Sequence, residues 1–182
     1  MTFFLVLLAG MFLSLLVQHF IGPIPPWGAR VMLMPIVMFY GAAALPLGGM
    51  LALTFAGGLM WDALCSQPID SGVEIAFGWS TLLYAVLGVI MSGFRPMFQR
   101  GIWGIHCLLC GILTASIVFS EFIMISIRRQ PVHFVFSPEI WWRIGGAGLI
   151  AALISPLFFI FLNYLAALVG YDPRAADEES SR

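Results

Sequence analysis

Apolar runs long enough to cross a lipid bilayer follow one another along almost the whole of this 182-residue chain. A transmembrane helix needs about 20 mainly apolar residues. Only 9% of the residues are charged, whereas soluble domains have about a quarter. A soluble fold of this size has too little interior to bury so much apolar surface. The sequence therefore predicts an integral membrane protein.

Six apolar segments, separated by short stretches rich in proline, glycine and arginine, are predicted to form helices. They cover residues 2–21, 30–45, 47–64, 73–91, 103–127 and 142–169. Only helices and closed barrels satisfy the backbone in hydrocarbon, and these uninterrupted runs lack the alternation of barrel strands. We therefore expect an all-α, polytopic bundle of six transmembrane helices in a single domain, residues 1–170, with a short charged tail at 171–182. The short link between the second and third segments predicts a tight helical hairpin.

Composition and motifs argue against several functional classes. The net charge is −1, without the basic patch that nucleic-acid binding needs. No nucleophile elbow, pair of intramembrane aspartates or phosphate-binding loop is found, so we expect neither an enzyme nor a cofactor. The motif HCLLC contains Cys107 and Cys110 but has no second ligand cluster, which favours apolar packing over a metal site. The arginines divide equally between the two predicted sides, so the positive-inside rule does not orient the chain.

Small residues recur at a spacing of four in the third and the last predicted helix. The two stripes are Gly48, Ala52 and Ala56, and Ala147, Ala151 and Ser155. Such stripes let helices approach closely in lipid, where no hydrophobic force drives helices together. They serve either packing within this chain or the docking of a partner's transmembrane helix.

Polar residues on the fifth predicted helix fall near one face. They are His106, Cys110, Thr114 and Glu121. An ionisable group inside a transmembrane helix is costly and is often functional. Glu121 therefore either has a functional role or lies near the interface and pairs with an arginine. A proton relay would need several such carboxylates, and the helix has one.

Asp62 lies at the end of the third predicted helix, before a loop rich in serine, proline and glycine. A negative charge at a helix C-terminus opposes the helix dipole, so we expect Asp62 and the adjacent Trp61 to make a contact. The candidate ion-pair partners of Asp62 are Arg30 and Arg143. Gly58, one turn earlier, allows another helix to approach closely.

The fourth helix is predicted to begin within the loop that follows Asp62. Asp70 or Ser71 is the candidate N-cap, because both side chains accept hydrogen bonds from the first backbone N–H groups of a helix. Glu74 then falls in the first turn, where the dipole favours a carboxylate. A structural role is therefore expected for Glu74 and not for Asp62.

The segment 128–143 is too apolar for a free loop and ends in Trp141 and Trp142. Tryptophans gather at the two membrane–water interfaces. The segment is therefore expected to lie in the interface with these two residues as an aromatic belt, or to dock a protein partner with them.

Together these features resemble the MreD family, the small membrane subunit of the bacterial rod-shape complex. The resemblance rests on six predicted helices in fewer than 200 residues and on three stretches of sequence, AGGLMWDALCSQPIDSG, FRPMFQRG and LISPLFFIFLNYL. Asp62, Ser66 and Pro68 fit the family pattern Asp-x-x-x-Ser-x-Pro. The family's glycine two residues after the proline is replaced by Gly72, four residues after it, so the loop is longer.

The resemblance implies a non-enzymatic scaffold of cell-wall elongation in the bacterial inner membrane. Such a protein binds the single-span protein MreC and through it links the actin-like filament to a SEDS glycosyltransferase and its transpeptidase. Both termini would be cytoplasmic, and the loops near Asp62 and the two tryptophans would face the periplasm. The partner-contact candidates are then Asp62, Trp61, Gly58, Pro68, Trp141, Trp142 and Glu121.

A second function follows from a related resemblance. The MreD bundle is similar to the six-helix substrate-binding subunit of energy-coupling-factor vitamin transporters. In that interpretation, Trp61 and the loop after the fifth helix form the walls of a ligand pocket. The scarcity of polar groups able to orient a vitamin favours the scaffold.

Overall fold

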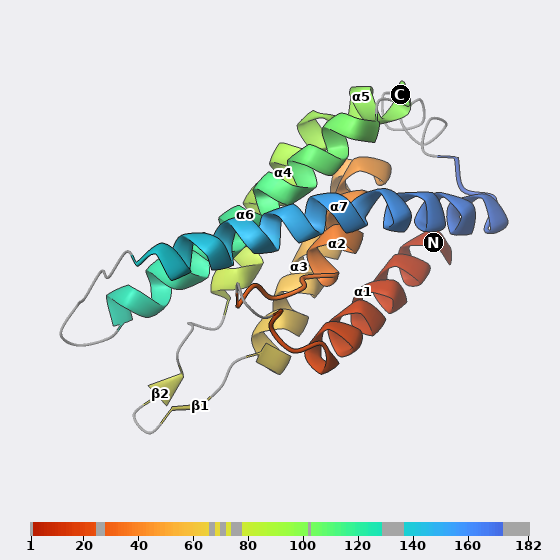
Figure 1. Cartoon of the computed structure of the whole chain (residues 1–182). Coiled ribbons are helices and arrows are strands. Elements are labelled where there is room, and N and C mark those ends of the chain that lie inside the picture. Colours follow the sequence, from red (N-terminus) through yellow and green to blue (C-terminus); the bar gives the residue numbers. More distant parts are fainter. Residues whose placement is uncertain are drawn as a thin grey trace.

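The computed structural model describes residues 2–24, 28–65, 68–69, 72–73, 78–101, 103–128 and 137–172. These residues fold into helices and one very short β-hairpin (Figure 1). The helices are α1 (Thr2–Phe20), α2 (Met34–Ala44), α3 (Leu47–Cys65), α4 (Trp79–Gly93), α5 (Arg95–Gln99), α6 (Trp103–Arg128) and α7 (Pro138–Leu168), and the antiparallel strands are β1 (Pro68–Ile69) and β2 (Gly72–Val73). The all-α class predicted from the sequence is confirmed.

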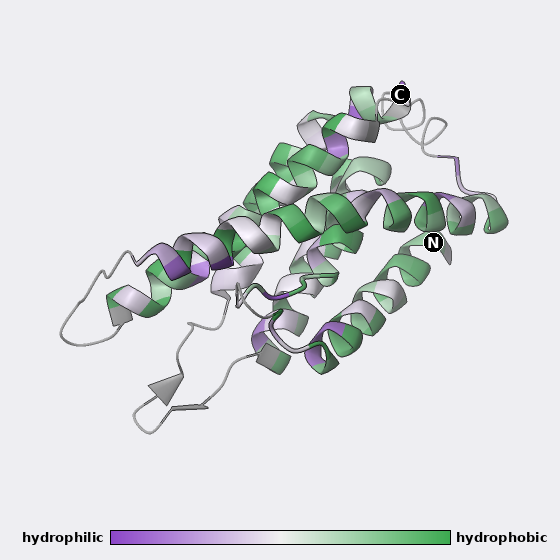
Figure 2. Ribbon diagram, in the orientation of Figure 1, coloured by the Kyte–Doolittle hydropathy of each residue, from purple (hydrophilic) through white to green (hydrophobic). Residues whose placement is uncertain are grey.

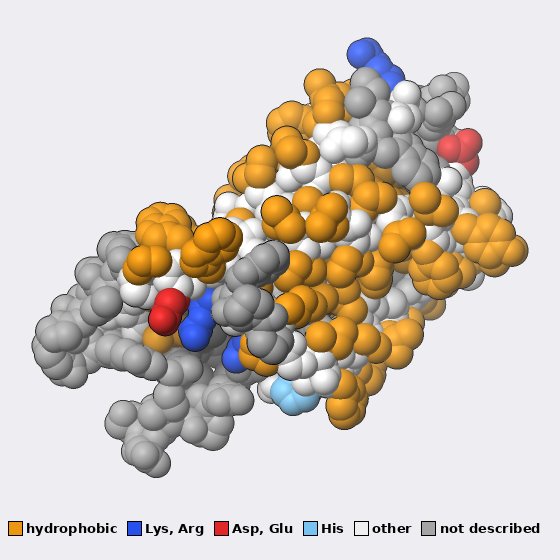
Figure 3. Space-filling model, in the orientation of Figure 1, with side chains coloured by type: hydrophobic (Ala, Val, Ile, Leu, Met, Phe, Trp, Pro, Cys, Tyr) orange, Lys and Arg blue, Asp and Glu red, His pale blue; other side chains and the backbone are white. Residues whose placement is uncertain are grey.

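Four of these helices are long and apolar enough to cross a membrane. They are α1, the segment Leu47–Leu64 of α3, the segment Gly104–Ile127 of α6, and α7. Apolar residues dominate the ribbons, and on the face shown in Figure 3 charged side chains gather toward the two ends of the molecule and leave the middle apolar (Figures 2 and 3). The chain is therefore a membrane protein. The apolar helices α2 and α4 are shorter, with 11 and 15 residues.

The second helix begins at Met34 and not near residue 30, as the sequence had predicted. The preceding residues are not helical, because Gly28 has a φ of +61° and Ala29 forms a β-bridge with Ile24. This fold keeps the chain extended as it enters the bundle.

The fourth helix begins at Trp79 and not near residue 73, because Gly72 and Val73 pair with β1. Its N-cap is Gly78, which has a left-handed backbone with a φ of +94°. The prediction of an N-cap at residue 70 or 71 is therefore wrong. Glu74 itself lies outside the described residues.

The last helix begins at Pro138, earlier than the predicted residue 142, and proline is favoured in the first turn of a helix. The short helix α5 also has a proline, Pro96, in its first turn. It was missed because the stretch FRPMFQRG contains two arginines and resembles a loop.

Helix α2 is the centre of the fold. Every one of its residues is buried, and it contacts α1, α3, α4, α5, α6 and α7. An 11-residue helix is only about 16 Å long, roughly half the thickness of the hydrocarbon core. Leu33 and Leu45, the residues that flank it, are buried, so both of its ends lie within the bundle, where unpaired backbone groups are costly.

Other elements satisfy the backbone at the start of α2. The Gln18 side-chain oxygen accepts hydrogen bonds from the backbone N–H groups of Leu33 at 2.9 Å and Met34 at 3.2 Å. Pro35 has no N–H to satisfy, and the N–H of Ile36 bonds to the Leu33 carbonyl. A single glutamine of α1 thus caps the central helix.

Two side chains cap the other end of α2. The Ala44 carbonyl accepts hydrogen bonds from the Tyr171 hydroxyl at 3.0 Å and from the buried Arg95 guanidinium at 3.4 Å. A positive charge at a helix C-terminus also complements the helix dipole. The ring of Tyr171 stacks on Phe3 of α1, so the end of the described chain closes this end of the bundle.

Glycines set the closest helix contacts. A Cβ on Gly58 of α3 would lie 2.6 Å from the backbone nitrogen of Thr81 in α4, and one on Gly111 of α6 would lie 2.7 Å from the Gly148 carbonyl oxygen of α7. The close approach predicted for Gly58 is confirmed. Neither α6–α7 glycine had been singled out, since their pairing depends on which helices become neighbours.

The two stripes of small residues have different surroundings. Ala147, Ala151 and Ser155 are buried, so the stripe on α7 packs within the chain. The stripe on α3 lies on the outside, with Gly48 and Ala52 exposed, and Gly48 has open space around it.

Candidate functional site

The end of the bundle away from the start of α1 and the end of α7 holds most of the predicted site residues. Figure 1 shows the start of α1 and the end of α7 near one end and the β1–β2 hairpin at the other. Asp62 and Trp61 reach the hairpin end from α3, Glu121 from α6, and Trp141 and Trp142 from α7. The helix topology thus brings together side chains that are up to 81 positions apart (142 − 61).

Asp62 is buried, with 3% of its surface exposed. Its Oδ2 accepts a hydrogen bond of 2.6 Å from the backbone N–H of Gly78, the N-cap residue of α4. The carboxylate therefore stands at the N-terminus of α4, where the helix dipole favours a negative charge. Asp62 therefore has a structural role at the start of α4, contrary to the prediction, and Glu74 precedes the first turn of that helix, which begins at Trp79.

The second carboxylate oxygen of Asp62, Oδ1, is buried without a hydrogen-bond partner among the described residues. The predicted pairing with an arginine is not the contact observed, because the bond of Asp62 is to a backbone N–H. Arg143 lies instead against Gly28, where an added Cβ would meet its Nε at 3.1 Å.

Glu121, Arg30 and Trp61 form a second polar group beside Asp62. Glu121 interacts electrostatically with Arg30 and Asp62 and lies close to the Trp61 side chain. The indole N–H of Trp61 is buried but makes no hydrogen bond of standard geometry with the described residues. Of the two interpretations of Glu121, the neighbouring arginine agrees with the interfacial one.

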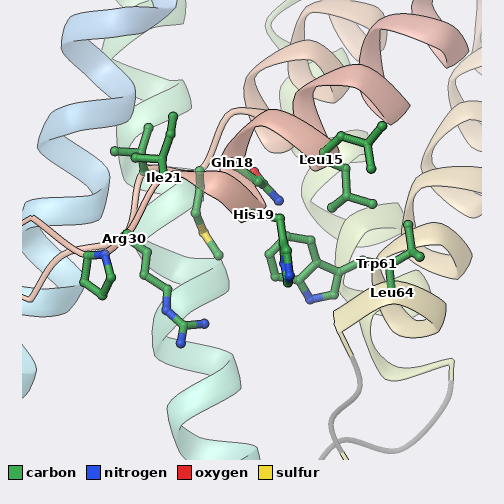
Figure 4. Close-up of a pocket in the computed structure, with 12 residues that line it drawn as sticks. Leu15, Gln18, His19, Ile21, Arg30, Trp61 and Leu64 are labelled. Atoms are coloured by element: carbon green, nitrogen blue, oxygen red, sulfur yellow. The ribbon is translucent and has the colours of Figure 1, made fainter.

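A cavity of about 310 Å³ opens next to this group, between the C-terminal ends of α1 and α3 and the segment that leads into α2 (Figure 4). It is lined by Leu15, Leu16, Gln18, His19, Ile21, Gly22, Pro23, Arg30, Val31, Met32, Trp61 and Leu64. Its polar lining combines Arg30, Gln18 and His19, whereas the remaining wall is mostly apolar. Glu121 and Asp62 do not line it.

The other candidate contact residues lie as follows. Gly58 is enclosed between α3 and α4, and Trp61 packs edge-on against Tyr84 of α4. Trp141 and Trp142 are exposed, and Trp141 stacks on Phe119. Pro68 belongs to β1. Contact with a partner stays a prediction for all of them, although Gly58, Trp61 and Asp62 are turned inward.

Sequence reasoning did not single out Gln18 and His19 as site residues. A signal was present, because these two polar residues interrupt the apolar character of the first helix in its last turn. Arg30 was considered only as an ion-pair partner. No group of three histidine, cysteine or carboxylate side chains able to hold a metal occurs within the described parts of the chain.

Replacement of Asp62 by alanine is expected to destabilise the start of α4. It removes a hydrogen bond from a buried carboxylate, and such charged hydrogen bonds contribute about 1.5–3 kcal/mol. Unfolding of the purified protein in mixed detergent micelles measures the loss. Asp62→Asn keeps an acceptor oxygen and is expected to recover most of the stability. Equal stability of the alanine and wild-type chains would contradict this role.

Comparison of the chain with protein-family models, with curated proteins and with solved structures finds no match.

Proposed function

We propose that this membrane protein is a non-enzymatic scaffold of bacterial cell-wall elongation that binds an MreC-like single-span protein. The observation that supports it best is the outward stripe on α3. The comparable stripe on α7 is buried against this chain's own helices, whereas Gly48 and Ala52 are exposed. Small residues on an outer face permit close approach of a transmembrane helix from another protein.

In this proposal all six of α1, α2, α3, α4, α6 and α7 count as membrane crossings in the inner membrane. Helices α2 and α4 are short for a crossing, but non-helical backbone at membrane depth is tolerated where protein encloses it. The capped ends of α2 meet that condition. Both termini then lie in the cytoplasm, and the end that holds Asp62, Trp141 and Trp142 faces the periplasm.

Purification through a C-terminal tag in mild detergent, followed by mass spectrometry, tests the proposal. A scaffold is expected to bring down a single-span coiled-coil protein of the MreC type, with a SEDS glycosyltransferase and its transpeptidase. Recovery of ATP-binding subunits with a coupling membrane protein would indicate transport and overturn it. Recovery of neither set from cells that produce the protein at its normal level would also count against it.

Ala52→Leu is expected to reduce recovery of the single-span partner by about tenfold or more, because a leucine side chain holds a docked helix away from the α3 backbone. Stability should hardly change, since Ala52 is exposed. Ala167→Leu is the matched control, because Ala167 is an exposed alanine on α7. The stripe is not a docking face if both variants retain the partner equally.

The cavity supports a second candidate, the substrate-binding subunit of a vitamin-type transporter. Trp61 lines it, as that interpretation requires, although the loop after α6 falls outside the described residues. Its volume of about 310 Å³ lies at the lower end of small-molecule sites, about 300–1,000 Å³. The scaffold remains the better supported of the two, because few polar side chains in the described lining could orient a vitamin.

A further inference from the structure

The cavity between α1 and α3 has the lining of a site for an amphipathic anion. One side presents hydrogen-bond donors and the other presents apolar side chains. Figure 4 shows Arg30 reaching into the space from the segment before α2, with His19 and Trp61 on its far side. A ligand that matches both sides has a negatively charged head and an apolar tail.

The donors come from three side chains. Arg30 is exposed to the cavity and carries a planar guanidinium, the group best suited to bidentate binding of a phosphate. The side-chain oxygen of Gln18 already accepts the hydrogen bonds that cap α2, so its amide NH₂ is the group that can donate to a ligand. His19 adds an imidazole from the last turn of α1.

The apolar wall continues outward onto the lipid-facing surface. Leu16, Ile21 and Leu64 line the cavity and are also exposed on the outside of α1 and α3. An acyl chain leaving the cavity would therefore pass directly onto an apolar surface. The buried Trp61 indole, whose N–H lacks a standard hydrogen bond, forms part of the floor.

The depth of the cavity agrees with that of a lipid headgroup. Gly28, two residues before Arg30, lies against Arg143, and Arg143 follows the exposed Trp141 and Trp142 directly. Exposed tryptophans mark the membrane–water interface. The donors thus lie at the level where phosphate groups of the bilayer are found.

Two carboxylates are close to the donors and have to be considered. Glu121 interacts with Arg30, and Asp62 interacts with Glu121, but neither lines the cavity. Asp62 is bonded to the start of α4. Arg30 is the charged side chain in the described lining, and Gln18 and His19 add hydrogen-bond donors, so the lining itself favours an anion.

We propose that this cavity binds the phosphate group of a membrane lipid, held by Arg30 with His19 and Gln18, with the acyl chains lying over Leu16, Ile21 and Leu64. The cavity volume of about 310 Å³ suits a headgroup and not a whole lipid. The inference does not depend on the scaffold function.

Native mass spectrometry of the purified full-length chain in detergent tests the site. The probes are phosphatidic acid, diacylglycerol with the same acyl chains, and inorganic phosphate. We expect one phosphatidic acid to be retained and diacylglycerol to be lost. Equal retention of diacylglycerol would mean that apolar contacts alone hold the lipid and would overturn the proposal. If inorganic phosphate bound as tightly as phosphatidic acid, the site would be one for a free anion, and the proposal of a lipid ligand would be overturned.

Variants locate the binding. Arg30→Gln is expected to weaken phosphatidic acid binding at least about tenfold, since charged hydrogen bonds are among the strongest polar contacts. Arg30→Lys keeps the positive charge but loses the planar guanidinium that binds phosphate through two N–H groups. Its affinity for phosphatidic acid should therefore lie between those of the wild type and Arg30→Gln. Arg100→Gln, an exposed arginine at the other end of the bundle, is the matched control and should bind normally.

A second position keeps the test decisive if Arg30 variants fold poorly. His19→Phe retains an aromatic ring but removes the donors, and it should also weaken phosphatidic acid relative to diacylglycerol. Unchanged binding in both the Arg30→Gln and His19→Phe proteins, each with a normal gel-filtration profile, would place the lipid elsewhere.

Discussion

Gly58→Ala is expected to be the most damaging single methyl addition in this chain. The new Cβ would fall on the backbone of Thr81, so α3 and α4 would have to move apart as rigid helices. Overpacking of this kind costs about 1–3 kcal/mol, occasionally more, which is a large share of the 5–15 kcal/mol that typically stabilises a protein. Unfolding in mixed micelles should show a loss at the upper end of this range.

Gly48→Ala is the matched control for that variant. It makes the same change on the same helix, but Gly48 has open space around it. Alanine is the better helix former by about 0.5–1 kcal/mol, so the control should be neutral or slightly stabilising. Similar behaviour of the two variants would show that α3 and α4 are not held in contact at Gly58.

Gln18→Leu is expected to cost about 2–6 kcal/mol of stability. The variant removes the hydrogen-bond acceptor of the Leu33 and Met34 N–H groups, and both residues are buried. Each unsatisfied buried group costs about 1–3 kcal/mol. Because α2 contacts six other helices, loosening of its first turn should spread through the bundle. Hydrogen exchange of the Leu33 and Met34 amides, combined with unfolding in mixed micelles, measures both effects.

Gln18→Glu separates the cap from the size of the side chain. Glutamate keeps acceptor oxygens in place, and a negative charge is favoured at a helix N-terminus. We therefore expect it to retain most of the wild-type stability, with amide protection close to normal. Loss of protection in the glutamate variant as large as that in the leucine variant would argue that Gln18 does not cap α2.

The long helices were accessible from the sequence because their signal is local. An uninterrupted apolar run of about 20 residues in α1, α3, α6 or α7 leaves few alternatives. The first residues of α2 and α4 were predicted wrongly, and the reason is local as well. A positive φ at Gly28 and the pairing of Gly72 and Val73 with β1 stop a helix that composition alone would continue.

Only part of the candidate site could be predicted from the sequence, because its contacts join residues that are far apart in the chain. Asp62 bonds to Gly78, 16 residues away, and Gln18 bonds to Leu33, 15 residues away. Neither contact produces a periodic pattern in the sequence from which it could be predicted. The dipole argument correctly identified a carboxylate in need of a partner, but it could not show that the N-terminus of α4 supplies that partner.

Photocrosslinking from position 52 in living cells is the most direct test of the central proposal, that the outer face of α3 docks a single-span partner. A photoreactive amino acid replaces Ala52 in one strain and Ala167 in another, both exposed positions. The proposal predicts a crosslink from position 52 to an MreC-like protein and none from position 167. Absence of that crosslink from position 52, or equal crosslinks from both positions, would contradict it.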